Sequence, residues 1–225
     1  MAVTVDTSAV GPSGTGSTLT ITGFTPGATA NALYVGIGYN DGVDTVSSVT
    51  WNGAAESFTS LFDNGPSSTG TSGWLLLNPT ITTANIVVTY TGPIADSQNA
   101  GVVSLIGVNT SAGVAGATRS IFSGSGTGTT LTVDVTDCVS GDLVIDTACV
   151  ARPEIFVDAS QTSRAEDQSI QGGFLSFGIS TETAVSATTT MSWTCSSSNP
   201  WVTRAFAFIP SGGTPITGLR PAICL

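Results

Sequence analysis

The chain has 225 residues, and 5 arginines stand against 15 aspartates and glutamates, which gives a formal net charge of −10. The absence of lysine and histidine, together with this charge, excludes nucleic acid and anionic membrane surfaces as expected partners, because both need clustered cations. It also removes the commonest general base and metal ligand, and the lysine of a phosphate-binding loop.

Polar and apolar residues alternate with a period of two along most of the chain, which is typical of β-strands with one buried face. Turn residues such as Asn-Gly and Gly-Pro separate the alternating stretches, and no segment keeps the 3.6-residue period of a helix. Strands are expected over residues 18–22, 33–39, 48–53, 57–62, 74–77, 85–90, 101–108, 131–135, 142–150, 174–180, 188–195 and 201–209. The sequence therefore predicts an all-β protein, a jelly-roll-like antiparallel β-sandwich of about twelve short strands with little or no helix.

Segments rich in Gly, Ser, Pro or charged residues are expected to be loops between these strands. They are residues 11–17, 65–72, 92–100, 124–128 and 164–173. The chain is accordingly divided into an N-terminal segment, a β-sandwich domain and a C-terminal extension. Their boundaries are residues 1–17, 18–210 and 211–225.

The C-terminal extension begins with a Gly-Gly-Thr-Pro sequence and continues with apolar residues. Two prolines favour an extended path over a helix, and an extended apolar segment can add to the open edge of a neighbouring sheet. We interpret the extension as an attachment arm that contacts a neighbouring subunit or a shell; the alternative is that it folds back on its own sandwich. The arm residues are Ile216, Leu219, Ile223 and Leu225.

Candidates for chemistry are few, and neither a catalytic site nor a cofactor is expected. Asp41 and Asp44 flank a glycine turn and are candidate Ca²⁺ ligands, although a plain turn between two strands explains them as well. Four glutamates could supply a glycosidase pair. However, Glu166 and Asp167 fall in an expected polar loop, where solvated charges are the simpler explanation.

The four tryptophans and the four cysteines are expected to be structural. Each tryptophan falls in or beside a predicted strand, where a core position is favoured over a sugar-stacking platform; Trp201 is expected to be the most exposed. The cysteines form no C-x-x-C pair, so buried free thiols are favoured over a zinc site or a disulfide. They are Cys138, Cys149, Cys195 and Cys224, of which Cys224, one residue from the end, is expected to be exposed.

The order of the strand motifs resembles that of jelly-roll-like sandwich domains of tailed-bacteriophage virion proteins and bacterial surface proteins. The resemblance covers residues 18 to 209 and is carried by strand motifs, so it transfers no functional site. The motifs are the stretches 46–53, 74–79, 86–90, 102–108, 141–146 and 191–194. The resemblance implies display on a particle or cell surface.

We therefore expect a non-enzymatic virion structural protein, most simply a capsid decoration or cement protein, or another exterior component such as a tail protein. It would be made in the host cytoplasm and sit on the virion exterior. Its partners would be the major capsid protein and further copies of itself, with a trimer as the first expectation. The alternative is a secreted carbohydrate-binding or adhesin module, and a glycosidase is a weaker third hypothesis.

Overall fold

The computed structural model describes residues 1–225 except 41–44, 64–68, 153, 170–173 and 214–225. This described part contains fourteen strands and one four-residue helix, α1 (Val114–Ala117). The prediction of an all-β antiparallel sandwich is confirmed, with fourteen strands against the expected twelve. None of the described helical residues forms a segment long and apolar enough to cross a membrane.

The first sheet has eight strands in the order β5-β4-β8-β3-β7-β6, and β1 and β2 pair with the free side of β8. The strand β8 is long because its first part pairs with β2 and β4 and its second part pairs with β1 and β3. The bounds are β1 (Thr4–Val10), β2 (Gly14–Phe24), β3 (Ala32–Asn40), β4 (Val46–Trp51), β5 (Glu56–Ser57), β6 (Thr59–Asp63), β7 (Gly70–Leu77) and β8 (Ala84–Ile106).

The second sheet has six strands in the order β11-β14-β10-β13-β12, and β9 pairs with β14. Here the long strand is β14, whose first part pairs with β11 and whose second part pairs with β10; β9 follows it along both parts. The bounds are β9 (Phe122–Val135), β10 (Leu143–Val150), β11 (Ile155–Val157), β12 (Thr162–Ser169), β13 (Leu175–Thr183) and β14 (Thr189–Phe208).

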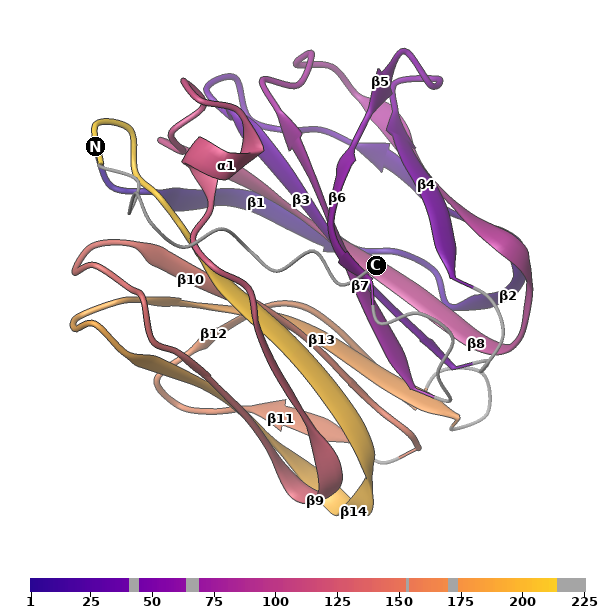
Figure 1. Ribbon diagram of the computed structural model, residues 1–225. Coiled ribbons are helices and arrows are strands. Elements are labelled where there is room, and N and C mark those ends of the chain that lie inside the picture. The colour runs from indigo at the N-terminus through magenta and orange to yellow at the C-terminus, as the bar shows by residue number, and fades with distance from the viewer. Residues whose placement is uncertain (41–44, 64–68, 153, 170–173, 214–225) are drawn as a thin grey trace.

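The two sheets have the same topology, so the chain contains an internal repeat. The order β4-β8-β3-β7-β6 of the first sheet corresponds strand by strand to β11-β14-β10-β13-β12 of the second. The single strand β9 takes the place of β1 and β2 together. We call residues 4–106 repeat 1 and residues 122–208 repeat 2; Figure 1 shows repeat 1 in indigo to magenta and repeat 2 in rose to yellow.

The sequence carries a short trace of this repeat. Residues 14–21 read GTGSTLTI and residues 126–133 read GTGTTLTV, so six of eight positions are identical. Both stretches occur where the pairing register with the long strand shifts, between Gly16 and Thr18 in repeat 1 and opposite residues 194–199 in repeat 2. Glycines at these register shifts let the strand bend together with its partner strand, because they carry no side chain that would clash at the bend.

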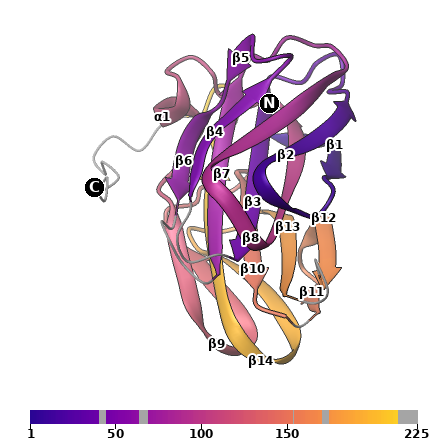
Figure 2. The ribbon, with the colours of Figure 1, turned by 90° about the vertical axis from the view of Figure 1, so that its right-hand side faces the viewer.

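Each sheet folds over on itself, so that its inner strands are buried on both faces. In β3, Leu33 faces the core of repeat 1 and Tyr34 faces repeat 2; in β10, Val144 faces the core of repeat 2 and Ile145 faces repeat 1. This double burial explains why β3 and β10 are buried along nearly their whole length. The two repeats are stacked on these inner strands, with the edge strands β1 and β12 lying close together (Figure 2).

The core between the repeats, which we call the central core, draws on both halves of the chain. Its aromatic centre joins Tyr34 to Phe206 and Phe208, with ring centroids 5.5 and 6.3 Å apart in edge-to-face contacts. The Tyr34 and Thr147 hydroxyls share a buried hydrogen bond of 2.6 Å across the interface. Its buried members are Val3, Ala32, Tyr34, Phe62, Leu75, Val103, Leu105, Val108, Ala117, Leu143, Ile145, Cys149, Ala165, Leu175, Phe177, Ile179, Val202, Phe206 and Phe208.

Glycines on the inner strands of repeat 1 allow the two sheets to approach closely. A Cβ atom added to Gly36 would lie 2.4 Å from Thr147 Oγ1, and one added to Gly101 would lie 2.6 Å from the Cβ of Ala165. Both partners belong to repeat 2. The bare backbone of β3 and β8 is therefore part of the packing surface between the repeats.

The connection between the repeats is fixed by a buried ion pair. Arg119 follows α1 and donates to both carboxylate oxygens of Asp142, at the start of β10, and both side chains are almost fully buried. The backbone N–H of Val139 also donates to Asp142, at 2.8 Å. This pair ties the linker to repeat 2, and losing either partner would leave an uncompensated buried charge.

Several segments expected to be loops are strands. Residues 92–100 continue β8, residues 124–128 belong to β9, and most of residues 164–173 lie in β12. These stretches have no continuous apolar face, but neighbouring strands supply their backbone hydrogen bonds. Likewise β1 lies in the expected N-terminal segment 1–17 and pairs with β8, so this segment is part of the first sheet.

Substituting a glycine between the repeats should destabilise the fold. We expect Gly36→Ala and Gly101→Ala each to lower the free energy of unfolding by about 1–3 kcal/mol, the usual cost of overpacking a core. Denaturant titration followed by tryptophan fluorescence measures this change.

Gly14→Ala is the matched control, because a Cβ there meets only Gln98 Nε2, at 3.9 Å. It should leave the unfolding midpoint unchanged or raise it slightly. Equal stability of all three variants would contradict close packing between the repeats.

Candidate functional site

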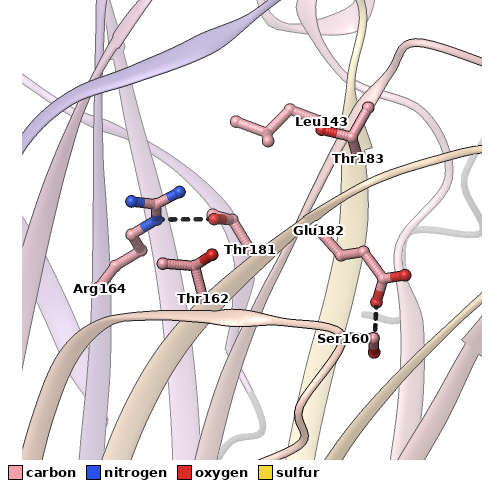
Figure 3. A pocket seen from close by; sticks show the side chains of 7 residues that line it. All are labelled: Leu143, Ser160, Thr162, Arg164, Thr181, Glu182 and Thr183. Carbon is pink, nitrogen blue, oxygen red and sulfur yellow. Dashed lines mark hydrogen bonds between the residues drawn. The ribbon is translucent and has the colours of Figure 1, made fainter.

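A polar hollow of about 320 Å³ opens at the edge of repeat 2, on the strands β12 and β13 and the turn before β12 (Figure 3). Thr162 pairs with Thr181 in the ladder between these strands, which places both side chains on the same face of the sheet. Apart from one leucine, the lining side chains are hydroxyls and charges. They are Leu143, Ser160, Thr162, Arg164, Thr181, Glu182 and Thr183.

Arg164 supplies the positive charge of the hollow. It occupies a bulge in β12, between the paired residues Ser163 and Ala165, and its Nε donates to Thr181 Oγ1 at 2.7 Å. The side chain is half-buried, and this burial lowers the pKa of Arg164. Within the described part of the chain, no carboxylate lies within 4.0 Å of its guanidinium group.

Glu182 follows Thr181 in β13, so its side chain lies on the opposite face of the sheet from Thr181 and Thr183. Its carboxylate accepts a hydrogen bond of 3.1 Å from Ser160 Oγ, and Ser160 is itself held by Asp158. Figure 3 shows Arg164, Thr162 and Thr181 together on one side and Glu182 with Ser160 on the other. The face that carries Arg164 therefore presents a cation and the hydroxyls of Thr162, Thr181 and Thr183, which donate or accept hydrogen bonds.

The repeat gives an internal comparison for this hollow. The strand β6 has the same bulge as β12, between Ser60 and Phe62, so that Leu61 occupies the position of Arg164. Thr59 pairs with Leu75 as Thr162 pairs with Thr181.

At the next position along this face, Leu77 pairs with Ala32 in repeat 1 and Thr183 pairs with Leu143 in repeat 2. All three leucines of repeat 1, Leu61, Leu75 and Leu77, belong to or pack against the central core. Repeat 2 thus has an arginine and two threonines where repeat 1 has three leucines.

A second polar group, centred on Asp146, lies inside repeat 2. Its carboxylate accepts hydrogen bonds from the Ser180 backbone N–H at 2.9 Å, from Ser180 Oγ at 2.7 Å and from Trp193 Nε1 at 2.7 Å. Gln161 Nε2 donates to Ser180 Oγ, and Gln161 Oε1 accepts from the Ser192 N–H. This buried network connects β10, β13 and β14 and fixes the turn that precedes β12.

Burial raises the pKa of Asp146 to about 7, although the bonds from Ser180 and Trp193 act in the opposite direction. The residue is fully buried and no described cation pairs with it. In repeat 1 the equivalent pair in the ladder is Val35 with Trp74, where repeat 2 has Asp146 with Ser180. The network is therefore a feature of repeat 2, as the hollow is.

Another hollow, of about 390 Å³, lies between the β1 and β2 ends of repeat 1. It is lined by residues 7–12 and 21–25, without a described charged side chain among them. Its lining offers backbone and small hydroxyl groups, so it has no group that would select a particular ligand.

The site residues expected from the sequence are not tested by the structure. The calcium candidates Asp41 and Asp44 lie outside the described residues, and so do the arm residues Ile216, Leu219, Ile223 and Leu225. Among the residues that are described, no three His, Cys, Asp or Glu side chains form a group that could hold a metal ion.

The acidic residues expected in a loop have structural contacts instead. Glu166 and Asp167 lie in β12, where Glu166 accepts a hydrogen bond from Ser163 Oγ at 3.1 Å. Asp167 accepts from Asn99 Nδ2 at 2.7 Å, across the interface between the repeats. The expectation that they lie in a loop was wrong, because β12 pairs with β13 along this stretch, but both side chains stay partly exposed.

The interpretation of the tryptophans as core residues is confirmed for three of the four. Trp51, Trp74 and Trp193 are buried, while Trp201 is partly exposed, as expected. The three described cysteines are free and buried, which confirms the expectation for them. They are Cys138, Cys149 and Cys195; Cys224 lies outside the described residues.

Comparison of the chain with protein-family models gives no match. Comparison with curated proteins likewise finds no match.

The buried Asp146 should make stability fall as pH rises. Its pKa is near 7 in the folded protein and near 3.8 when unfolded, so between these values the folded state holds a proton that the unfolded state has lost. The free energy of unfolding should therefore decrease with pH over this window, by up to about 1.4 kcal/mol per pH unit from this group.

Denaturant titrations at pH 4 to 8 test this, with Asp134→Asn as the control for general charge effects. Asp134 is exposed and bonds only to Thr190, at 2.6 Å, among the described residues. Asp146→Asn should flatten the pH dependence relative to Asp134→Asn. Parallel profiles for the two variants would contradict a raised pKa of Asp146.

Proposed function

We propose that the protein is a non-enzymatic structural component of a virion exterior, most simply a capsid decoration or cement protein. The observation that carries the proposal is the fusion of two like sandwich units through one central core. Two units that share a core form a single rigid body, because separating them would expose the inner faces of both sheets.

The outward faces of the described strands fit an exposed protein without charged binding patches. Threonines line β2, at Thr18 and Thr22, and β14, at Thr190 and Thr194, and all four are exposed. Hydroxyl groups keep such faces hydrated, while the net charge of −10 would repel packaged nucleic acid. A position outside the shell agrees with both features.

Attachment would use the C-terminal extension, residues 211–225. The last described residues are anchored: Ser211 N–H donates to Gly107 O at 2.7 Å, and Gly213 N–H donates to Pro210 O at 2.7 Å. The amino group of Met1 donates to Ser211 O at 3.1 Å, so the extension starts beside Met1. A chain that leaves the fold at this anchored point could reach a neighbouring subunit or the major capsid protein. The end of the folded molecule far from Met1 would then make no contact with the shell.

A secreted carbohydrate-binding or adhesin module is the second candidate. The observation that favours it is the polar hollow of repeat 2, whose lining includes Arg164 and several hydroxyls. Analysis of purified particles separates the two candidates. Mass spectrometry and micrographs should find the chain in fixed proportion to the major capsid protein; a chain found only in culture medium or on cell surfaces would favour the module.

Truncation after Gly213 tests the attachment arm. If the extension is an attachment arm, the truncated chain should keep the unfolding midpoint of the full chain, because the removed residues would contact other subunits, and it should lose homo-oligomer formation and particle binding. Light scattering and co-sedimentation with particles measure these two properties. The arm is rejected if the truncated chain unfolds, or if it assembles and binds as strongly as the full chain.

A further inference from the structure

A hydroxyl, a carboxylate and an amide meet inside repeat 2 in an arrangement suited to covalent chemistry. Ser180 Oγ donates to Asp146 Oδ1 at 2.7 Å and accepts from Gln161 Nε2 at 2.5 Å. Trp193 Nε1 donates to the other oxygen of Asp146 at 2.7 Å, which fixes the direction of the carboxylate. A hydroxyl that bonds to a base, with the base oriented by a third group, is the arrangement of an activated nucleophile.

Repeat 1 shows that the fold does not require these polar groups. The equivalent positions there hold Val35, Trp74 and Phe58, and all three are buried in the core of that repeat. Repeat 2 buries a carboxylate, a hydroxyl and an amide in the same place, where each needs a hydrogen-bond partner to offset the cost of desolvation. Filling the core does not account for the polar group, because apolar side chains fill it in repeat 1.

The amide of Gln161 is presented to the Ser180 hydroxyl as an electrophile. Its carbon lies one C–N bond, about 1.33 Å, beyond Nε2, so it is within about 4 Å of Ser180 Oγ. On its other side, Gln161 Oε1 accepts from the backbone N–H of Ser192 at 2.6 Å. A backbone N–H in this position stabilises the negative charge that develops on the oxygen when a nucleophile adds to the carbon.

We propose that Ser180 and Gln161 become joined by an ester bond, which the folded chain forms by itself with Asp146 as the general base. Ser180 Oγ attacks the amide carbon of Gln161 while the hydroxyl proton passes to Asp146. The C–N bond of the tetrahedral intermediate then breaks as Asp146 returns this proton to the nitrogen. Ammonia leaves with the two amide hydrogens and the hydroxyl hydrogen, so Asp146 is regenerated, and the step needs no oxidant or co-reactant.

Burial favours both the reaction and its product. It raises the pKa of Asp146 to about 7, which suits a group that takes up and returns a proton near neutral pH. Ser180 is 0% and Gln161 7% exposed, so water has little access to the amide carbon or to the ester. The bond would tie β13 to the turn before β12, which is an edge strand of the second sheet.

Mass spectrometry of the intact full-length protein, denatured after incubation at neutral pH, tests the proposal. The mass should be lower by one ammonia molecule than the mass calculated for a chain with the same N-terminus. Trypsin locates the bond, because it cleaves after Arg164, between Gln161 and Ser180. Under reducing conditions the peptides on either side of Arg164 should stay joined, and mild alkali should separate them by hydrolysing the ester.

Variants test the roles of the residues. Ser180→Ala lacks the nucleophile and Asp146→Asn lacks the base, so each should have its full calculated mass and separate tryptic peptides. Ser163→Ala and Asp134→Asn are the matched controls, because both residues are exposed and neither belongs to the buried group. Both controls should lose ammonia as the parent chain does.

The proposal is overturned if the parent chain has its full mass, or if its tryptic peptides separate without alkali. A succinimide at Asn52, which precedes a glycine, would also release ammonia, but it would leave the peptides separate. An unchanged cross-link in Asp146→Asn would contradict the role of Asp146 as the base. If a variant does not fold, fragmentation of the joined peptides from the parent decides, because it identifies the two linked residues. These measurements use the isolated protein, so they do not depend on particle attachment.

Discussion

The fold depends on one constraint, the burial of the inner sheets on both faces. A single repeat could bury the faces inside its own folded sheet, but the other faces of β3 and β10 carry Tyr34, Ile145 and further apolar groups that need a second layer. Each repeat provides that layer for the other. Burial of this apolar surface is the dominant favourable term, and the hydrogen bond between Tyr34 and Thr147 fixes the register of the two sheets.

The shared core also explains why the two repeats could diverge. Positions in the middle of the interface, such as Gly36 opposite Thr147 and Ile179, are fixed by close contact. Positions at the edge are less constrained, because a polar side chain there still reaches solvent. The equivalent edge positions hold Leu61 in repeat 1 and Arg164 in repeat 2. One copy thus keeps an apolar edge that stabilises the stack, and the other has a polar edge.

The sequence predicted the fold class because alternation with a period of two reflects burial directly, as in residues 18–22 and 131–135. It failed where strands have no apolar face. The glycine- and serine-rich start of β9 and the charged strand β12 are strands because β14 and β13 supply their hydrogen bonds. The strand propensity of a segment carries no information about the neighbouring strand that will pair with it.

The internal repeat and the candidate site escaped prediction for a related reason. The repeat leaves only short identities, the GTG-x-TLT stretches and the Thr-Ser pairs at 59–60 and 162–163, which gain meaning once the registers are known. Arg164 is one of five scattered arginines in the sequence. Its significance comes from its bulge, its bond to Thr181 and the leucine at the equivalent position, all of which are properties of the folded chain.

Differential scanning calorimetry of the full chain tests the shared core most directly. If the two repeats are stable only together, the protein should unfold in one transition, with a calorimetric enthalpy equal to the van't Hoff enthalpy. Two separate transitions, or a van't Hoff enthalpy near half the calorimetric value, would show that the repeats unfold independently and would contradict this account.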